Sequence, residues 1–263
     1  MHKIAILITT FMKDAIMYKT VQSIVDNYTE DCVVLIADQG YQSDEKIITY
    51  DYFKSQIPCE VFYLPFDCGL SYARNYLVQK AHDMNLPYVL MGADSIQFLT
   101  KYDFNPIITF LEQESYRGVV GFELNGSKCP WEYLMSLDKN GIHFNVSNEI
   151  TIFQGIKYKK VDICRNIFLA KTDTLIGLWD NEMKLAEHEL AFLEYKKRGY
   201  SVHWTDSIIF KKCSGNTSVE YQIYRKRFSD FQKILKQKLG ISTWVTYSPD
   251  VMKEIHEYQA KHK

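Results

Sequence analysis

The chain has 263 residues, of which 46% are hydrophobic, and it carries 31 Lys and Arg against 32 Asp and Glu. This composition excludes a largely disordered chain. Because the charges nearly cancel, it also excludes a surface that is cationic all over, which is typical of nucleic-acid binders. Only 12 Gly and six Pro are available for flexible linkers, which favours one large domain.

Cysteine usage and hydropathy indicate the compartment. No Cys-x-x-Cys pair or zinc-ligand spacing occurs, so we interpret the cysteines as free thiols in a reducing compartment. They are Cys32, Cys59, Cys68, Cys129, Cys164 and Cys213. The apolar run Ile4–Ile8 is too short for a signal peptide, and no segment has the length of a membrane span. We expect a cytoplasmic protein without an obligate protein partner.

The first hundred residues predict strands that alternate with helices. Short aliphatic runs predict buried strands, and apolar residues at helical spacing predict the helices between them. The strands are Ile4–Ile8, Cys32–Ala37, Val61–Leu64 and Tyr88–Met91, and the helices are Ile16–Val25 and Ser71–Met84. This alternation predicts an α/β fold with a mostly parallel sheet and helices on its faces.

Polar residues follow each of these four strands. They are Thr9 and Thr10, Asp38, Asp67, and Asp94. A single Asp after a strand is more often a turn former or helix cap. Ligands of parallel sheets bind at the carboxyl ends of the strands, so four such positions in succession favour a shared ligand pocket.

The second half is less regular. Val119–Leu124 predicts a strand, and Ile142–Phe153 predicts a hairpin. A helix is predicted from Trp179 onward, with Asp180 as its cap, because apolar residues recur at helical spacing. Glu187 and His188 would flank the buried face of that helix.

Four ordered segments carry a resemblance to a known family. They are Ile-Leu-Ile-Thr-Thr-Phe-Met-Lys at residues 6–13, Ile36-Ala37-Asp38-Gln39-Gly40, Asp67-Cys68-Gly69-Leu70-Ser71-Tyr72-Ala73-Arg74-Asn75, and Trp179-Asp180-Asn181-Glu182-Met183-Lys184-Leu185-Ala186-Glu187-His188. The chain resembles inverting nucleotide-sugar glycosyltransferases of the GT-A class, namely glycosyltransferase family 2 and its N-acetylgalactosaminyltransferase-like relatives. The third segment is the most specific, because it matches that family's Gly-Leu-Ser-x-x-Arg-Asn motif.

The resemblance implies a GT-A fold, a single Rossmann-like domain with a mostly parallel central sheet flanked by helices. We expect this domain over residues 1–240, with a nucleotide-binding half at 1–100 and an acceptor and catalytic half at 101–240. Residues 241–263 would form a helical tail. The implied activity is inverting transfer of a hexosyl or N-acetylhexosaminyl group from a UDP-sugar donor to a hydroxyl acceptor, such as a glycan.

The resemblance also implies which residues bind the donor. They are Thr9, Thr10, Asp38, Asp67, Arg74 and Asp94. Asp38 is suited to accept hydrogen bonds from the uracil imide or the ribose hydroxyls. For Arg74, two alternatives remain open, since it either lines the nucleotide pocket or forms an ion pair with Asp67.

On the acceptor side, the resemblance implies Glu187 as the catalytic base. Inverting transfer needs a carboxylate on the face opposite the leaving diphosphate. The alternative is that Glu187 makes only a contact on a helix surface. Trp131, in a Cys-Pro-Trp-Glu loop, is a candidate for stacking on an acceptor sugar.

The metal motif is where the chain departs from the family. An Asp-x-Asp motif would hold a divalent ion on the diphosphate, but the aligned residues are Ala93-Asp94-Ser95. We favour a weakened Mn²⁺ or Mg²⁺ site at Asp94, with His188 as a second ligand. The alternatives are replacement of the metal by Lys211 or Lys212, or a non-catalytic nucleotide-sugar-binding module.

Basic residues gather late in the chain. Lys211–Lys238 contains eight basic and two acidic residues. A solvated helix face is the usual explanation for such a run. The run could instead hold the diphosphate or an anionic partner, either a membrane surface or DNA. A second enzymatic alternative is therefore a glycosyltransferase that acts on hydroxymethylated bases in DNA.

Overall fold

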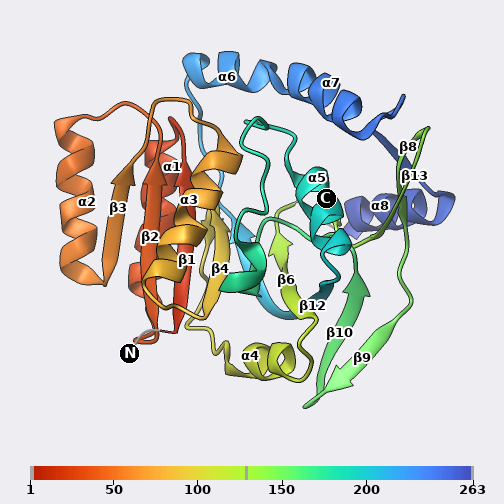
Figure 1. The fold of residues 1–263 in the computed structure, drawn as a ribbon. Coiled ribbons are helices and arrows are strands. Elements are labelled where there is room, and N and C mark those ends of the chain that lie inside the picture. Colours follow the sequence, from red (N-terminus) through yellow and green to blue (C-terminus); the bar gives the residue numbers. More distant parts are fainter. Residues whose placement is uncertain (1–2, 128–129, 262–263) are drawn as a thin grey trace.

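The computed structural model describes residues 3–127 and 130–261, and its main element is a ten-stranded sheet (Figure 1). The order of the strands is β3-β2-β1-β4-β11-β6-β12-β10-β9, and β5 pairs with β12 beside this path. Five cysteines are free thiols, whereas Cys129 lies outside the described residues. No helix in the described ranges is both long and apolar enough to cross a membrane.

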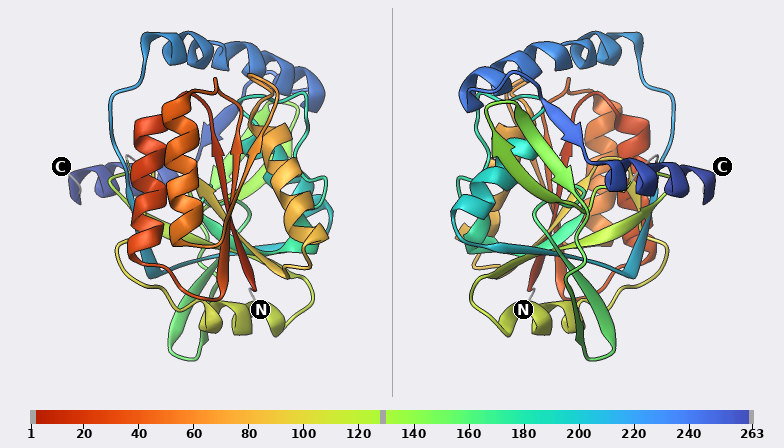
Figure 2. Two further views of the ribbon diagram at one scale, coloured as in Figure 1. Left: turned by 90° about the vertical axis from the view of Figure 1, so that its left-hand side faces the viewer. Right: turned by 90° about the vertical axis from the view of Figure 1, so that its right-hand side faces the viewer.

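The four strands of the first half are parallel, as predicted. They are β1 (Ile4–Thr10), β2 (Cys32–Asp38), β3 (Cys59–Tyr63) and β4 (Tyr88–Ala93). Helices α1 (Asp14–Asp26) and α2 (Asp44–Gln56) cover one face, and α3 (Leu70–Asp83) covers the other (Figure 2). Every residue of β1 and β2 is buried, because both faces of the sheet are covered.

Alternate residues of β1 enter two separate hydrophobic cores. Leu7 packs in the core that contains Leu77 of α3, whereas Ile6 and Ile8 pack in the core that contains Val21 of α1. This period of two follows from the geometry of a strand. The helices therefore occupy the faces of the sheet and leave the carboxyl ends of its strands free.

The second half of the sheet is mixed. Strand β11 lies antiparallel between β4 and β6, and β12 runs parallel to β6. The elements of this region are β5 (Ile96–Gln97), α4 (Asn105–Glu112), β6 (Arg117–Asn125), β7 (Leu134–Asp138), β8 (Gly141–Asn145), β9 (Ile150–Phe153), β10 (Ile156–Val161), β11 (Phe168–Lys171), the 3₁₀ helix η1 (Thr172–Leu175), α5 (His188–Lys197) and β12 (Ser201–Lys212).

The predicted hairpin Ile142–Phe153 is wrong. Strand β8 pairs with β7, and β9 pairs with β10. Gln154 and Gly155 join β9 to β10, with φ angles of 50° and 78°. Two central residues with positive φ form the tight turn that closes a hairpin, so the chain folds back here instead.

The last elements cross the open end of the sheet. Helices α6 (Val219–Lys226) and α7 (Phe228–Leu239) lie across the carboxyl ends of the first parallel strands (Figures 1 and 2). Within residues 241–263, β13 (Val245–Tyr247) joins β8 and β7 in a small sheet. Helix α8 (Pro249–Lys261) follows it, and its Val251 is buried.

The helix predicted from Trp179 is present only from His188 onward, as α5, so its predicted start and its cap at Asp180 are wrong. The backbone of residues 179–187, which precedes α5, instead accepts hydrogen bonds from the start of α3. Ser71 Oγ donates to the carbonyl oxygen of Met183 at 2.6 Å, and Asn75 Nδ2 donates to that of Trp179 at 2.6 Å. These bonds use carbonyl groups that a helix would need for itself.

A glycine allows this close approach of the two segments. Gly69 has a φ of 98°, and a Cβ atom at this position would lie only 2.7 Å from the Cα atom of Lys184. Only glycine tolerates both the dihedral angle and the contact. The segment before α5 is therefore held against the start of α3, which fixes the position of Glu187.

Candidate active site

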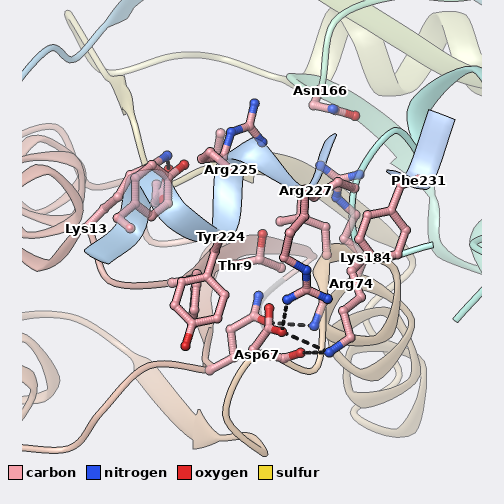
Figure 3. Close-up of a pocket in the computed structure, with 18 of the residues that line it drawn as sticks. Thr9, Lys13, Asp67, Arg74, Asn166, Lys184, Tyr224, Arg225, Arg227 and Phe231 are labelled. Carbon is pink, nitrogen blue, oxygen red and sulfur yellow. Dashed lines mark hydrogen bonds and ion pairs between the residues drawn. The ribbon is translucent and has the colours of Figure 1, made fainter. Parts of the chain in front are cut away.

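Two adjoining cavities open at the carboxyl end of the parallel strands. The first, which we call the cationic cavity, measures about 820 Å³ with its mouth and is shown in Figure 3. The second, the tryptophan cavity, measures about 1090 Å³ and is lined by Trp131 and Trp244. Their shared lining residues are Leu70, Ala93, Ser95, Asn166 and Arg225.

Positive charge dominates the cationic cavity. Five basic side chains and two carboxylates line it, which leaves an excess of three positive charges. They are Lys13, Arg74, Lys184, Arg225, Arg227, Asp67 and Asp94. A cleft lined by one sign of charge concentrates ligands of the opposite sign. The cavity therefore fits an anionic ligand.

Asp94 forms an ion pair inside this cavity. Its Oδ1 atom lies 2.8 Å from Nζ of Lys13, and the two side chains are 10% and 19% exposed. The ammonium also lies 5.3 Å from the centre of the Tyr221 ring. Burial disfavours the charged ammonium, but the interactions with Asp94 and Tyr221 together outweigh this and raise the pKa of Lys13. Lys13 is therefore a cation at neutral pH.

Asp67 joins three segments of the chain. Its Oδ2 atom accepts hydrogen bonds from Nζ of Lys184 at 3.0 Å and from Nη1 of Arg227 at 2.8 Å (Figure 3). Lys184 also donates to the carbonyl oxygen of Asp67. The loop after β3 is thus linked to the segment before α5 and to the junction of α6 and α7. The alternative in which Arg74 pairs with Asp67 is not formed.

Arg74 pairs instead with Glu187. Its Nη1 atom lies 2.5 Å from Oε1 of Glu187, and the two side chains are only 4% and 6% exposed. Arg74 lines the cationic cavity, whereas Glu187 lines the tryptophan cavity. The ion pair therefore lies at the boundary between the two cavities and fixes the direction of the Glu187 carboxylate.

Two of the predicted ligand-binding residues do not line either cavity. Asp38 is 1% exposed, and its Oδ2 atom accepts a hydrogen bond from the Tyr50 hydroxyl at 2.7 Å and lies 3.0 Å from Nζ of Lys46. Its Oδ1 atom accepts from the backbone N–H of Gly40 at 2.8 Å. Thr10, paired with Asp38 in the sheet, is also buried. Both residues thus lie in the interior.

Of the residues at the strand ends, Thr9 lines the cationic cavity together with Asp67 and Asp94. Gln39, which follows Asp38, lines it too, and its Oε1 atom accepts from the N–H of Gly69 at 2.7 Å. The sequence prediction missed Gln39, Lys13 and Lys184 as lining residues. All three lie inside the segments that carry the family resemblance, which is the signal that could have found them.

The tryptophan cavity contains two further ionisable groups, the half-buried His188 and the buried Glu189. His188 makes edge-to-face contacts with Trp131 and Phe192, at 5.5 and 5.1 Å between ring centres, and its burial lowers its pKa to about 4. Burial of Glu189 raises the pKa of its carboxyl to about 8. At neutral pH, His188 is therefore a neutral ring and Glu189 is protonated.

The residues present do not fit the divalent metal that the family resemblance implies. On a diphosphate, such an ion takes most of its oxygen ligands from the phosphates and from water, and it needs one or two free carboxylates of the protein. Within residues 3–127 and 130–261, no three His, Cys, Asp or Glu side chains gather where they could hold a metal ion. Asp94 lines the cationic cavity and faces Lys13, whereas the predicted second ligand, His188, lines the other cavity.

Lys211 and Lys212, the possible substitutes for the metal, do not line the cationic cavity. Lys211 is exposed and pairs with Gln97 in the sheet, and Lys212 lines the tryptophan cavity. Of the basic residues described within Lys211–Lys238, only Arg225 and Arg227 reach the cationic cavity. The charge beside Asp94 comes from Lys13 instead.

Comparisons with known proteins identify the family. The profile described as Glycosyl transferase family 2 matches residues 5–175. No curated protein sequence matches the chain.

Three solved structures illustrate the likeness in fold. S. aureus TarS 1-349 is 12% identical, with a TM-score of 0.58 over 89% of this chain and 64% of that chain. GalNAc-T7 with UDP, GalNAc and Mn²⁺ is 12% identical, with a TM-score of 0.62 over 81% and 44%. The mannosyltransferase PcManGT from Pyrobaculum calidifontis, with GDP-Man and Mn²⁺, is 9% identical, with a TM-score of 0.59 over 98% and 69%.

At these identities the likeness shows the fold alone, and it confirms the predicted GT-A fold. The chain spans 64% of the TarS fragment and 44% of GalNAc-T7, so it corresponds to a part of these proteins.

Proposed function

The chain belongs to glycosyl transferase family 2, and from its site we propose that it transfers a sugar from a UDP-type donor to an acceptor hydroxyl with inversion. One observation carries this proposal. A cavity with an excess of three positive charges adjoins a cavity that contains a buried carboxylate, and the Arg74–Glu187 ion pair lies between them. Donor and acceptor would thus meet at this boundary.

The cationic cavity is the proposed donor site. A nucleoside diphosphate carries its negative charge on the two phosphates, which the basic side chains of the cavity would neutralise. Phe11 and Tyr224 line the same cavity, and their rings are in edge contact at 5.1 Å between centres. Aromatic rings stack on nucleobases, so we assign this wall to the base. The TarS fragment was also solved with UDP-GlcNAc, which supports a UDP-type donor.

The tryptophan cavity is the proposed acceptor site. Trp131 and Trp244 line this cavity. Indole rings offer large apolar surfaces, on which the apolar face of an acceptor sugar would pack.

The chemistry follows from this arrangement. The acceptor hydroxyl oxygen forms a bond to the anomeric carbon while the bond from that carbon to the diphosphate oxygen breaks. The electron pair of the broken bond stays on the diphosphate, and the hydroxyl proton passes to the Glu187 carboxylate. Because attack comes from the side opposite the diphosphate, the anomeric configuration inverts. Arg74 acts as a positioning residue that directs Glu187 toward the acceptor.

Titration calorimetry with UDP and GDP, followed by an assay of UDP-sugar turnover, tests the proposal. We expect UDP to bind more tightly than GDP and a UDP-sugar to be turned over. Absence of any nucleotide binding would contradict the proposed donor site. Binding of UDP without hydrolysis or transfer to any of a panel of acceptors would show a non-catalytic binding module.

A further inference from the structure

The sheet register brings Lys13 and Asp94 together. Strands β1 and β4 are parallel neighbours, and Thr9 at the end of β1 lies beside Ala93 at the end of β4. The loops that follow both strands therefore leave the sheet at the same point. Lys13 belongs to the loop after β1, and Asp94 is the first residue after β4. Their ion pair at 2.8 Å thus follows from the fold of the parallel half.

Lys13 is placed where an anion would bind. It lines the cationic cavity, and its ammonium lies between the Asp94 carboxylate and the face of the Tyr221 ring of α6. A cation over an aromatic ring gains further stabilisation. Lys13 is therefore held by Asp94 at the end of β4 and by Tyr221 of α6, the helix that crosses the end of the sheet.

The other basic side chains of the cavity have different partners. Lys184 and Arg227 are paired with Asp67, and Arg74 is paired with Glu187. Arg225 has no carboxylate partner among the described residues, and it lines both cavities. Lys13 is thus the only one of the five that neutralises Asp94, which is the position implied for the metal.

A divalent ion at Asp94 would meet this ammonium. It would have to displace Lys13 or lie beside it, in a cavity that already has an excess of three positive charges. Like charges that are close together and partly buried repel strongly. In addition, Asp94 is the one carboxylate of the cavity besides Asp67, and Asp67 is already paired with two cations.

We propose that Lys13 takes the place of the divalent metal ion and that this enzyme transfers its sugar without one. When the bond from the anomeric carbon to the diphosphate breaks, the electron pair stays on the diphosphate oxygen. The Lys13 ammonium keeps its proton and stabilises this charge electrostatically. The inference rests on the proposed function, since it concerns the same diphosphate.

The first test compares UDP binding by calorimetry, and UDP-sugar turnover, in EDTA and in Mn²⁺ or Mg²⁺. We expect both to change less than twofold for the natural chain. Lys13→Ala is expected to weaken UDP binding about tenfold and to lower turnover about a hundredfold. Lys19→Ala removes an exposed lysine of helix α1, which begins directly after Lys13; it serves as the matched control and is expected to behave as the natural chain.

A second variant does not depend on the loss of Lys13. Asp94→Asn removes the negative charge but keeps the size of the side chain, so Lys13 would be free to pair with the diphosphate. We expect UDP to bind this variant more tightly in EDTA. A metal site at Asp94 would give the opposite result, because Asp94→Asn would then weaken UDP binding in Mn²⁺. Electron paramagnetic resonance of Mn²⁺ with UDP and protein gives a readout that needs no turnover.

The outcomes separate the two proposals. Turnover that EDTA abolishes and Mn²⁺ restores would overturn the role of Lys13 and leave the proposed function intact. So would UDP binding by Lys13→Ala that equals that of the natural chain, or Mn²⁺ bound together with UDP. Absence of UDP binding under every condition would overturn the proposed function itself.

Discussion

The two cavities differ in the side chains that would contact a ligand. Each carboxylate of the cationic cavity is paired with a basic side chain, and the excess charge is positive. The tryptophan cavity is also lined by basic side chains, but it combines them with indole rings and two buried carboxyl groups, of which Glu187 is paired with Arg74 and Glu189 is protonated at neutral pH. The indole rings and the buried carboxyl groups therefore distinguish the proposed acceptor site from the proposed donor site.

The role of Glu187 gives the largest expected effect. Glu187→Gln keeps the shape and can still accept a hydrogen bond from Arg74, but it cannot take the acceptor proton. We expect turnover to fall by about 10²- to 10⁴-fold, with UDP binding unchanged within twofold by calorimetry. Glu189→Gln is the matched control, because Glu189 lines the same cavity and is already protonated. Normal turnover in Glu187→Gln would contradict the division between the two cavities.

Removal of one partner breaks the Arg74–Glu187 ion pair at the boundary between the cavities. Arg74→Leu leaves the buried Glu187 carboxylate without its partner, which costs about 3 to 5 kcal/mol of stability. Urea denaturation would measure this loss. The double variant Arg74→Leu, Glu187→Leu removes both charges and is expected to be more stable than Arg74→Leu alone. A double variant as unstable as the sum of the single variants would show that the two residues are not coupled.

Glu189 predicts a pH dependence of stability. Its folded-state pKa of about 8 lies above the ordinary value of 4.5, so the folded protein keeps this proton while the unfolded chain loses it. Stability is therefore lost as the pH rises from about 4.5 to about 8, by up to about 1.4 kcal/mol per pH unit. Glu189→Gln removes this contribution.

The melting temperature of Glu189→Gln, relative to the natural chain, should therefore increase from pH 5 to pH 8. Comparison with the natural chain at each pH cancels the opposite contribution of His188, whose lowered pKa affects stability below its ordinary value. A melting-temperature difference that does not depend on pH would show that Glu189 is not protonated in the fold.

Arg225 gives the smallest expected effect, because four other cations line the donor side. Arg225→Ala is expected to weaken UDP binding about tenfold or less, equivalent to about 1.4 kcal/mol. Lys211→Ala, which removes an exposed lysine of the same basic segment, should leave the affinity unchanged. Equal weakening by both variants, measured by calorimetry in the same buffer, would indicate general attraction by the basic segment instead of a contact in the cavity.

The sequence predicts the parallel half well, since β1 and β2 are aliphatic runs buried on both faces. The sequence does not predict helix α2, because polar and apolar residues exchange their usual places there: Ile47 and Ile48 are exposed and Lys46 is buried. Lys46 is also why Asp38 lies in the interior, so one missed helix explains one misplaced site residue.

Contacts between distant segments account for the remaining differences. The segment before α5 is irregular because Ser71 binds the backbone of Met183, 112 residues away. The Lys13–Asp94 pair joins residues 81 positions apart, and the Arg74–Glu187 pair joins residues 113 apart. Local periodicity contains no information on such pairs, whereas the family motifs located Asp94, Arg74 and Glu187 but did not show which residues they pair with.

One measurement tests the central claim most directly. Nuclear magnetic resonance can follow the anomeric proton of the sugar during transfer from a UDP-sugar to an acceptor. We expect a product whose anomeric configuration is opposite to that of the donor, formed by the natural chain and not by Glu187→Gln. A product with retained configuration, or equal product formation by Glu187→Gln, would contradict that claim.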